Sequence, residues 1–154
     1  MVAPVAPRDV AWAIASALPD PEIPALTIAE LGILRGVEMI DGVMIVTITP
    51  TYSGCPATEM IKADIETALR EAGFSAIAVR LIHSPAWTTD TLSAATLEKL
   101  RAEGIAPPRR GQTPHCPQCG SAQVEQIAGF GSTPCKSLWR CIACREPFDH
   151  FKCH

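Results

Sequence analysis

The stretch Thr49-Pro50-Thr51-Tyr52-Ser53-Gly54-Cys55-Pro56 joins two regular patterns and decides the fold of the first half of the chain. Residues 43–49, which lead into it, are apolar and β-branched, as strands prefer. Residues 57–72, which follow it, place apolar side chains at steps of three and four, the spacing of a helix that stops at Gly73. The sequence therefore predicts a strand, a turn that carries Cys55, and a helix.

Cys55 is predicted to lie at or near the N-cap of this helix, because Pro56 suits the first helical position. The positive end of the helix dipole and the N–H groups of the first turn both favour a thiolate over a thiol. A thiolate can hold a metal ion or attack a sulfur centre. The alternative interpretation is a small apolar side chain that fills the turn.

The elements around this turn predict an α+β domain. Asp41-Gly42 between strands 34–40 and 43–49 is the two-residue signal for a type I′ hairpin. A helix over residues 8–18 precedes the hairpin, and a strand over 77–81 follows the central helix. The predicted order is α-β-β-α-β, with the helices on the sheet and a right-handed strand-helix-strand connection. A last helix is expected over 90–103, with a threonine as its N-cap.

The composition indicates one modest core with a small appended module. The chain has 154 residues, of which 47% are hydrophobic and 19% charged. No apolar run reaches the roughly 18 residues that a membrane span requires, and the N-terminus lacks a signal pattern of a basic flank and a long apolar core. We therefore expect a cytoplasmic protein without membrane contact.

Cysteine and charge both change near residue 107. Six of the seven cysteines lie between Cys116 and Cys153. Residues 1–107 carry a net charge of −6 and residues 108–154 a net charge of +3. These changes predict a domain over 8–106, a linker over 107–114 that is rich in proline, and a second module over 115–154. The module lacks a dense basic stripe with interleaved aromatic residues, so a nucleic-acid partner is not expected, whereas an acidic protein partner stays open.

The second module carries two C-x-x-C knuckles. Cys116 and Cys119 form the first, Cys141 and Cys144 form the second, and 21 residues separate the two knuckles. Four thiolates on two tight turns make the tetrahedral site of a zinc ribbon, with Gly120 supplying backbone freedom at the first turn. Since about forty residues cannot form a sufficient core, metal binding would supply most of the module's folding free energy. Structural Zn²⁺ is the first expectation, and rubredoxin-type iron or an iron–sulfur cluster stays open.

Two cysteines remain outside the knuckles. Cys135 and Cys153 are read as buried apolar thiols, as a second thiol pair, or as ligands for a transferred metal. The sequence does not decide between these interpretations.

The segment Asp20-Pro21-Glu22-Ile23-Pro24 sets two acidic side chains between prolines. One interpretation is a solvated turn in which the aspartate bonds to its own backbone. The other is a rigid acidic rim beside the Cys55 turn. The four histidines lie outside that turn in the sequence, and no His/carboxylate arrangement accompanies a nucleophile, so an enzyme with its own substrate pocket is not predicted.

Over residues 8–106 the sequence resembles the small cytosolic iron–sulfur cluster assembly domain. The resemblance lies in the acidic segment, Leu31-Gly32, the hairpin, the Cys55 turn and the helix after it. The tail resembles the D subunit of bacterial phenylacetyl-CoA epoxidase. The motifs that carry this second resemblance are Phe130-Gly131-Ser132-Thr133-Pro134-Cys135-Lys136, Arg140-Cys141, Cys144-Arg145-Glu146-Pro147-Phe148-Asp149 and Phe151-Lys152-Cys153.

The resemblance implies a non-catalytic accessory subunit of a di-iron oxygenase system in aerobic phenylacetate breakdown. It implies that Cys55, with Asp20 and Glu22, transiently handles iron or an iron–sulfur cluster during metal-centre maturation. It assigns the ribbon ligands to the four knuckle cysteines. The implied partners are the oxygenase and reductase subunits, with a homo-oligomer left open. A scaffold subunit and a thiol redox protein that uses Cys55 with Cys135 or Cys153 are the alternatives.

Overall fold

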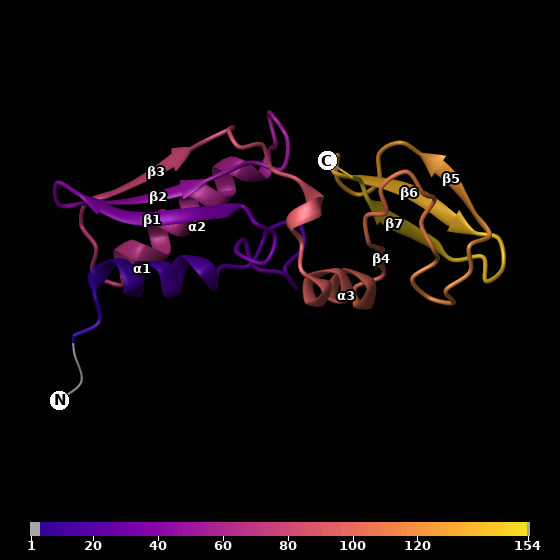
Figure 1. Cartoon of the computed structure of the whole chain (residues 1–154), viewed down its shortest axis with the longest axis horizontal. Coiled ribbons are helices and arrows are strands. Elements are labelled where there is room, and N and C mark those ends of the chain that lie inside the picture. The colour runs from indigo at the N-terminus through magenta and orange to yellow at the C-terminus, as the bar shows by residue number, and fades with distance from the viewer. Residues whose placement is uncertain (1–3, 154) are drawn as a thin grey trace. The chain divides into compact units, whose positions relative to one another are not determined.

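The computed structural model describes residues 4–153, which fall into two units divided between Trp87 and Thr88. The first unit contains α1 (Pro7–Ser16), β1 (Leu34–Ile40), β2 (Val43–Ile48), α2 (Ala57–Glu71) and β3 (Ile77–Leu81) (Figure 1). This order confirms the α-β-β-α-β prediction. Among the described residues, no helix is both long and apolar enough to cross a membrane.

The first sheet has the strand order β1-β2-β3. β1 and β2 form the predicted hairpin, in which Asp41 and Gly42 have φ angles of 49° and 80°. Positive φ at both central residues is what a type I′ turn requires. β3 pairs in parallel with β2 after the α2 crossover. The carboxyl ends of β2 and β3 therefore meet at one edge of the sheet.

The core of this unit lies between the sheet and its helices. β2 alternates strictly, so that Met44, Val46 and Ile48 are at most 1% exposed and share one face. α1 contacts β1 and α2, and α2 contacts β3. Ile65 and Leu69 of α2 are fully buried, and burial of such a side chain contributes about 1.5–3 kcal/mol each.

The segment between α1 and β1 has little regular structure, yet its apolar side chains belong to the core. Leu26, Ile28 and Leu31 are at most 2% exposed. The Trp87 indole N–H donates a hydrogen bond of 2.7 Å to the Leu31 carbonyl. These contacts fix the backbone that carries the acidic segment at residues 20–24.

The second unit is a small sheet preceded by helical turns. It contains a 3₁₀ helix, η1 (Thr89–Thr91), followed by α3 (Ala94–Ala102), β4 (Ile105–Ala106), β5 (Val124–Ala128), β6 (Lys136–Cys141) and β7 (Pro147–Phe151). Its strand order is β4-β7-β6-β5, with β4 parallel to β7 and the remaining pairs antiparallel. An α+β domain followed by a small ribbon-like sheet is thus the observed fold class.

The helix expected over 90–103 is wrong at its start. Thr88 accepts a hydrogen bond from the Asp90 N–H and caps only η1. The chain then extends at Leu92, and Ser93 caps α3 by accepting from the Thr96 N–H at 3.1 Å. Two separate caps therefore split the expected helix.

The division into units also falls earlier than the linker that the sequence predicts at 107–114. Ile105 pairs with Asp149 and Ala106 with His150, so β4 is part of the second sheet. This pairing joins the residues just before the predicted linker to the ribbon.

Candidate metal centre and thiol turn

The two knuckles bring the four predicted cysteines together. One ligand atom each from Cys116, Cys119, Cys141 and Cys144 lies within 4.8 Å of all the others. The Cys116 and Cys144 sulfurs are 3.7 Å apart, and those of Cys119 and Cys141 are 3.6 Å apart. Tetrahedral Zn–S bonds of about 2.3 Å place sulfurs about 3.8 Å apart. The donor set and its spacing therefore fit a four-coordinate metal ion.

Both knuckles close with the same backbone turn. The Gly120 N–H donates to the Cys116 carbonyl at 2.9 Å, and the Arg145 N–H donates to the Cys141 carbonyl at 3.0 Å. The residue after each second cysteine has a positive φ, 76° at Gly120 and 72° at Arg145. The sequence predicts the positive φ at Gly120. It does not predict the positive φ at Arg145, because this conformation costs free energy for a residue with a side chain.

Hydrogen bonds within the second knuckle favour charge on one sulfur. The Cys144 backbone N–H donates to the Cys141 Sγ at 3.4 Å. This bond, helped by the Cys119 thiol, lowers the pKa of Cys141 to about 7 although burial opposes the shift. A lowered thiol pKa is the condition for metal binding, since the thiolate is the ligand.

Apolar packing beside the four thiols is modest. Cys116 and Cys141 are buried together with Ala106 and Phe148. Val124 and Trp139 cover this cluster and are only partly buried themselves. The ribbon therefore joins one small apolar cluster to one candidate metal centre.

The remaining two cysteines differ in exposure. Cys135 is buried, with its Sγ 3.0 Å from the Thr133 hydroxyl, whereas Cys153 is half-buried. All seven cysteines are free thiols. The roles in a second pair or in metal transfer stay predictions. His154, at the end of the predicted module, lies outside the described residues.

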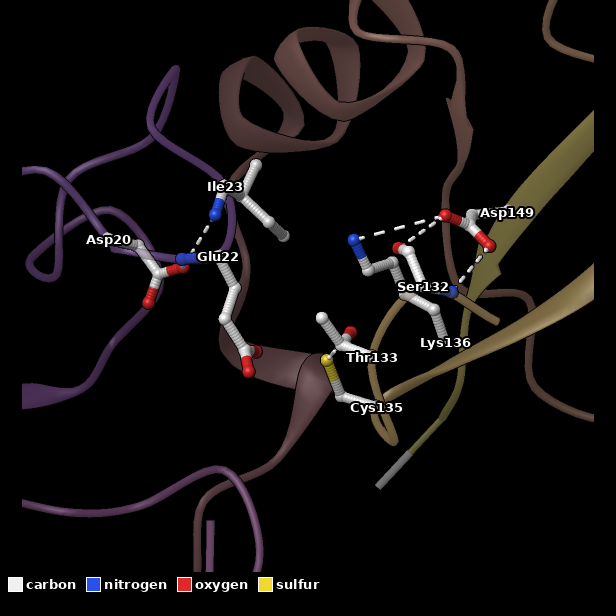
Figure 2. Close-up of polar contacts among 8 residues, drawn as sticks. All are labelled: Asp20, Glu22, Ile23, Ser132, Thr133, Cys135, Lys136 and Asp149. Carbon is white, nitrogen blue, oxygen red and sulfur yellow. Dashed lines mark hydrogen bonds and ion pairs between the residues drawn. The ribbon is translucent and has the colours of Figure 1, made fainter. Parts of the chain in front are cut away.

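A tight loop between β5 and β6 is organised by a carboxylate that the sequence analysis did not single out. Figure 2 shows Asp149 accepting hydrogen bonds from the Ser132 hydroxyl at 2.7 Å and the Ser132 N–H at 3.3 Å. The buried Lys136 ammonium lies 4.0 Å from the same carboxylate. A Cβ at Gly131 would lie 2.2 Å from the Asp149 Oδ1, so a larger residue there would displace the Asp149 carboxylate.

Cys55 lies at the turn between β2 and α2, one residue before the N-cap, which is Pro56. Its carbonyl accepts from the Thr58 N–H at 3.1 Å, and its N–H donates to the Tyr52 carbonyl at 3.3 Å. The Thr51 hydroxyl contacts its sulfur at 3.9 Å. Cys55 is half-buried rather than enclosed in the core. The thiol is thus held by a defined turn and keeps access to solvent.

Asp20 is 5% exposed and organises the acidic segment from within. Its Oδ1 accepts from the Glu22 N–H at 2.9 Å and the Ile23 N–H at 2.8 Å (Figure 2). The backbone bonds agree with the first interpretation, but the carboxylate is buried rather than solvated. Its part in metal handling stays a prediction.

Glu22 lies close to the start of α2. A cavity of about 190 Å³ is lined by Pro21 and Glu22 on one side and by Pro56, Ala57 and Met60 on the other. The acidic segment and the residue that follows Cys55 therefore border the same space, as the rim interpretation requires.

All four histidines lie outside the Cys55 turn in the sequence, but the structure places His83 beside the residues that lead into it. His83 lines a cavity of about 110 Å³ together with residues 49–53 and Trp87. It follows β3, whose carboxyl end lies beside that of β2. The parallel pairing was a signal that His83 and Thr49 reach the same edge of the sheet.

Comparison with known protein families divides the chain in a similar way. Residues 9–75 match the family described as "Iron-sulfur cluster assembly protein". Residues 104–152 match the family described as "PaaD zinc beta ribbon domain". The second match begins just before β4.

Individual relatives extend the comparison over the whole chain. A protein of Escherichia coli (strain K12), named as the putative D subunit of 1,2-phenylacetyl-CoA epoxidase, is 46% identical over 99% of this chain and 98% of its own length. An "Fe-S protein maturation auxiliary factor" of Porphyromonas gingivalis (strain ATCC BAA-308 / W83) is 31% identical over 53% of this chain and 78% of its own. A solved structure of a "Domain of Unknown Function DUF59" from Bacillus anthracis is 25% identical, with a TM-score of 0.54. It covers 60% of this chain and 90% of its own.

Proposed function

Because the chain belongs to the family of PaaD-type D subunits of phenylacetyl-CoA epoxidase, we propose that it assists maturation of an iron or iron–sulfur centre in that oxygenase system. Cys55 is the residue that carries the proposal. In this proposal Cys55 binds the iron or cluster transiently and passes it to a client protein. The metal of the ribbon stays bound and has a structural role. Ring epoxidation itself takes place on other subunits, so the chain is an accessory subunit without catalysis of its own.

The position of Cys55 is the observation that supports this role. A half-buried thiol on a defined turn, followed by Pro56 in the lining of a cavity that Glu22 also borders, sets a sulfur and a carboxylate near the start of α2. Both are iron ligands. Two protein ligands leave coordination positions open, so ligands of a client protein can displace them. The closed set of four thiolates in the ribbon leaves no such position.

The ribbon metal in this proposal is structural Zn²⁺. The fit of the four sulfurs to a tetrahedral ion and the match to a zinc ribbon family both support it. Residues Cys116, Cys119, Cys141 and Cys144 would hold the ion and fix the two knuckles.

The proposed partners are the oxygenase and reductase subunits of the epoxidase system. The full-length similarity to a D subunit supports this assignment. Within the accessory role, Asp20 would hold the loop that presents Glu22, since its carboxylate binds that loop's backbone.

The decisive experiment is Cys55→Ala in a strain that co-expresses the oxygenase subunits. The expected result is an oxygenase depleted of iron and inactive, with one zinc per accessory chain unchanged. Metal analysis and visible absorption spectra measure the iron of the oxygenase and the zinc of the accessory chain. The proteins are prepared with and without oxygen. Ser53→Ala is the matched control, because Ser53 is exposed on the same turn.

Full iron loading and activity with Cys55→Ala would contradict the maturation role. If the variant then co-purified with the oxygenase in stoichiometric amount, the chain would be a scaffold subunit instead. Thiol titration before and after mild oxidation separates a third outcome, a reversible disulfide of Cys55 with Cys135 or Cys153, which would make it a redox protein.

A further inference from the structure

A cavity of about 260 Å³ lies beside the first knuckle of the ribbon. Three basic residues line it, Arg101 from α3 and Arg109 and His115 from the segment before the knuckle. The other lining residues are prolines, Gly120 and the buried Cys116. None of the described residues that line it is acidic.

The two arginines differ in their capacity to bind an anion, and Arg109 keeps the larger share. Arg109 donates a hydrogen bond of 2.7 Å to the Gln112 side-chain oxygen, a neutral acceptor that leaves the guanidinium charge uncompensated. Arg101 forms a bidentate pair with Glu98 within α3, through its Nε at 3.1 Å and its Nη2 at 2.6 Å, and both side chains are more than half exposed. An exposed pair is screened by solvent, so an incoming carboxylate can compete with Glu98, but less easily than for a single contact.

We infer that this cavity is a docking site for an acidic polypeptide segment of a partner protein. Arginine forks match the planar carboxylates of aspartate and glutamate, and both nitrogens of one guanidinium can bind one carboxylate. Pro107 and Pro117 provide a rigid apolar surface for a neighbouring side chain of the segment. Positive charge and apolar surface in one cavity thus complement a segment that combines carboxylates with apolar residues.

The chemistry of the lining favours a polypeptide over a nucleic acid. No phenylalanine, tyrosine or tryptophan is among the described lining residues, so bases find no large aromatic surface on which to stack. The docking site is independent of Cys55 and goes beyond the maturation role. It gives the ribbon a binding surface in addition to its metal.

The test measures binding of an acidic peptide to the full zinc-loaded chain. The probe is a hexapeptide of sequence EELLEE with acetylated and amidated ends, titrated into ¹⁵N-labelled protein at low salt. We expect saturable shifts of the Cys116 and Gly120 amide resonances. Binding weakens as ionic strength rises, because salt screens the charges. A peptide of sequence KKLLKK is expected to leave these resonances unchanged.

Charge-reversal variants place the binding in the cavity. Arg109→Glu should weaken peptide binding about tenfold or more, because it sets like charges opposite each other. Arg110→Glu is the matched control, since it makes the same change in net charge but Arg110 does not line the cavity and pairs with Asp90. We expect it to change binding by no more than about twofold at moderate salt.

Three results would overturn the inference: no saturable shifts, equal weakening by both variants, or equally strong shifts from inorganic phosphate at the peptide's concentration. The last result would make the cavity a small-anion site only. Zinc content and the remaining amide resonances report whether each variant is folded. Arg101→Glu repeats the test if Arg109→Glu unfolds the ribbon.

Discussion

The two units of this chain are stabilised by different means. The first unit buries large apolar side chains completely, from its irregular loop, β2 and α2: Leu26, Ile28, Leu31, Met44, Val46, Ile48, Ile65 and Leu69. In the second unit, the large side chains buried to this degree among the described residues are Phe151, Leu100 and Pro114. Its four knuckle thiols converge instead. We therefore expect the first unit to fold on apolar burial and the second to depend on a metal ion.

The largest effect should come from removing the metal. A structural Zn²⁺ site contributes about 10 kcal/mol or more to folding. With a strong chelator, or with Cys141→Ser, we expect the amide resonances of residues 115–153 to collapse to unfolded positions. Those of residues 8–87 should stay dispersed in ¹⁵N correlation spectra.

Cys153→Ser is the control, because Cys153 is half-buried and outside the group of four sulfurs. It should keep both the metal and the dispersed spectrum. A ribbon that stays folded after complete metal removal would show that its apolar cluster suffices, and the contrast between the units would fail.

A smaller effect is expected from a cavity in the first unit. Leu69 is 0% exposed in α2, and truncation of such a leucine costs about 2–5 kcal/mol. Leu69→Ala should lower the urea midpoint of the first unit and leave the zinc content unchanged. Arg70→Ala, at the exposed neighbouring position, should cost about 0.5 kcal/mol or less. A loss of zinc from Leu69→Ala would show that the two units do not fold independently.

The smallest expected effect is a pH dependence of the stability of the ribbon, caused by His150. His150 is buried, its Nε2 lacks a hydrogen-bond partner among the described atoms, and burial lowers its pKa below the ordinary 6.5. In the unfolded chain this histidine takes up a proton first. Its contribution to stability is therefore complete above about pH 6.5 and is lost as pH falls from there through the folded-state pKa.

His150→Phe removes this titration and keeps a ring beside Trp139, which His150 meets edge-on. Zinc-saturated wild type should lose stability faster than the variant as pH falls below 6.5, measured by chemical denaturation at several pH values. If the stability of the two proteins fell equally with pH, His150 would not be the cause of the pH dependence. An NMR titration that gives His150 a pKa above 6.5 would do the same.

The sequence predicts the structure correctly where a few neighbouring residues determine it. Asp41-Gly42 and the alternation around it gave β1 with its correct bounds, because a type I′ turn is encoded in two residues. The spacing of the knuckle cysteines predicted their convergence, since each tight turn fixes two of the four sulfurs. The position of Cys55 beside the start of α2 followed from Pro56 in the same way.

Features that depend on distant partners escaped the sequence analysis. Ile105 and Ala106 lie more than forty residues before their partners in β7, and two residues carry no recognisable strand pattern. The close approach of Gly131 to the Asp149 side chain required knowledge of how the loop before β6 packs against β7. The position of His83 could have been predicted from the sequence. The carboxyl ends of parallel neighbouring strands lie at the same edge of a sheet, so His83 after β3 lies near the residues that follow β2.

The short strand β4 has a practical consequence for dissecting the molecule. A fragment cut at Pro107, where the composition suggests a linker, would lose Ile105 and Ala106 and strip β7 of its outer neighbour. Bare strand edges recruit strands from other molecules, so such a fragment invites aggregation even when loaded with zinc. A fragment that starts at Thr88 retains this protective strand and is the sounder choice for isolating the ribbon.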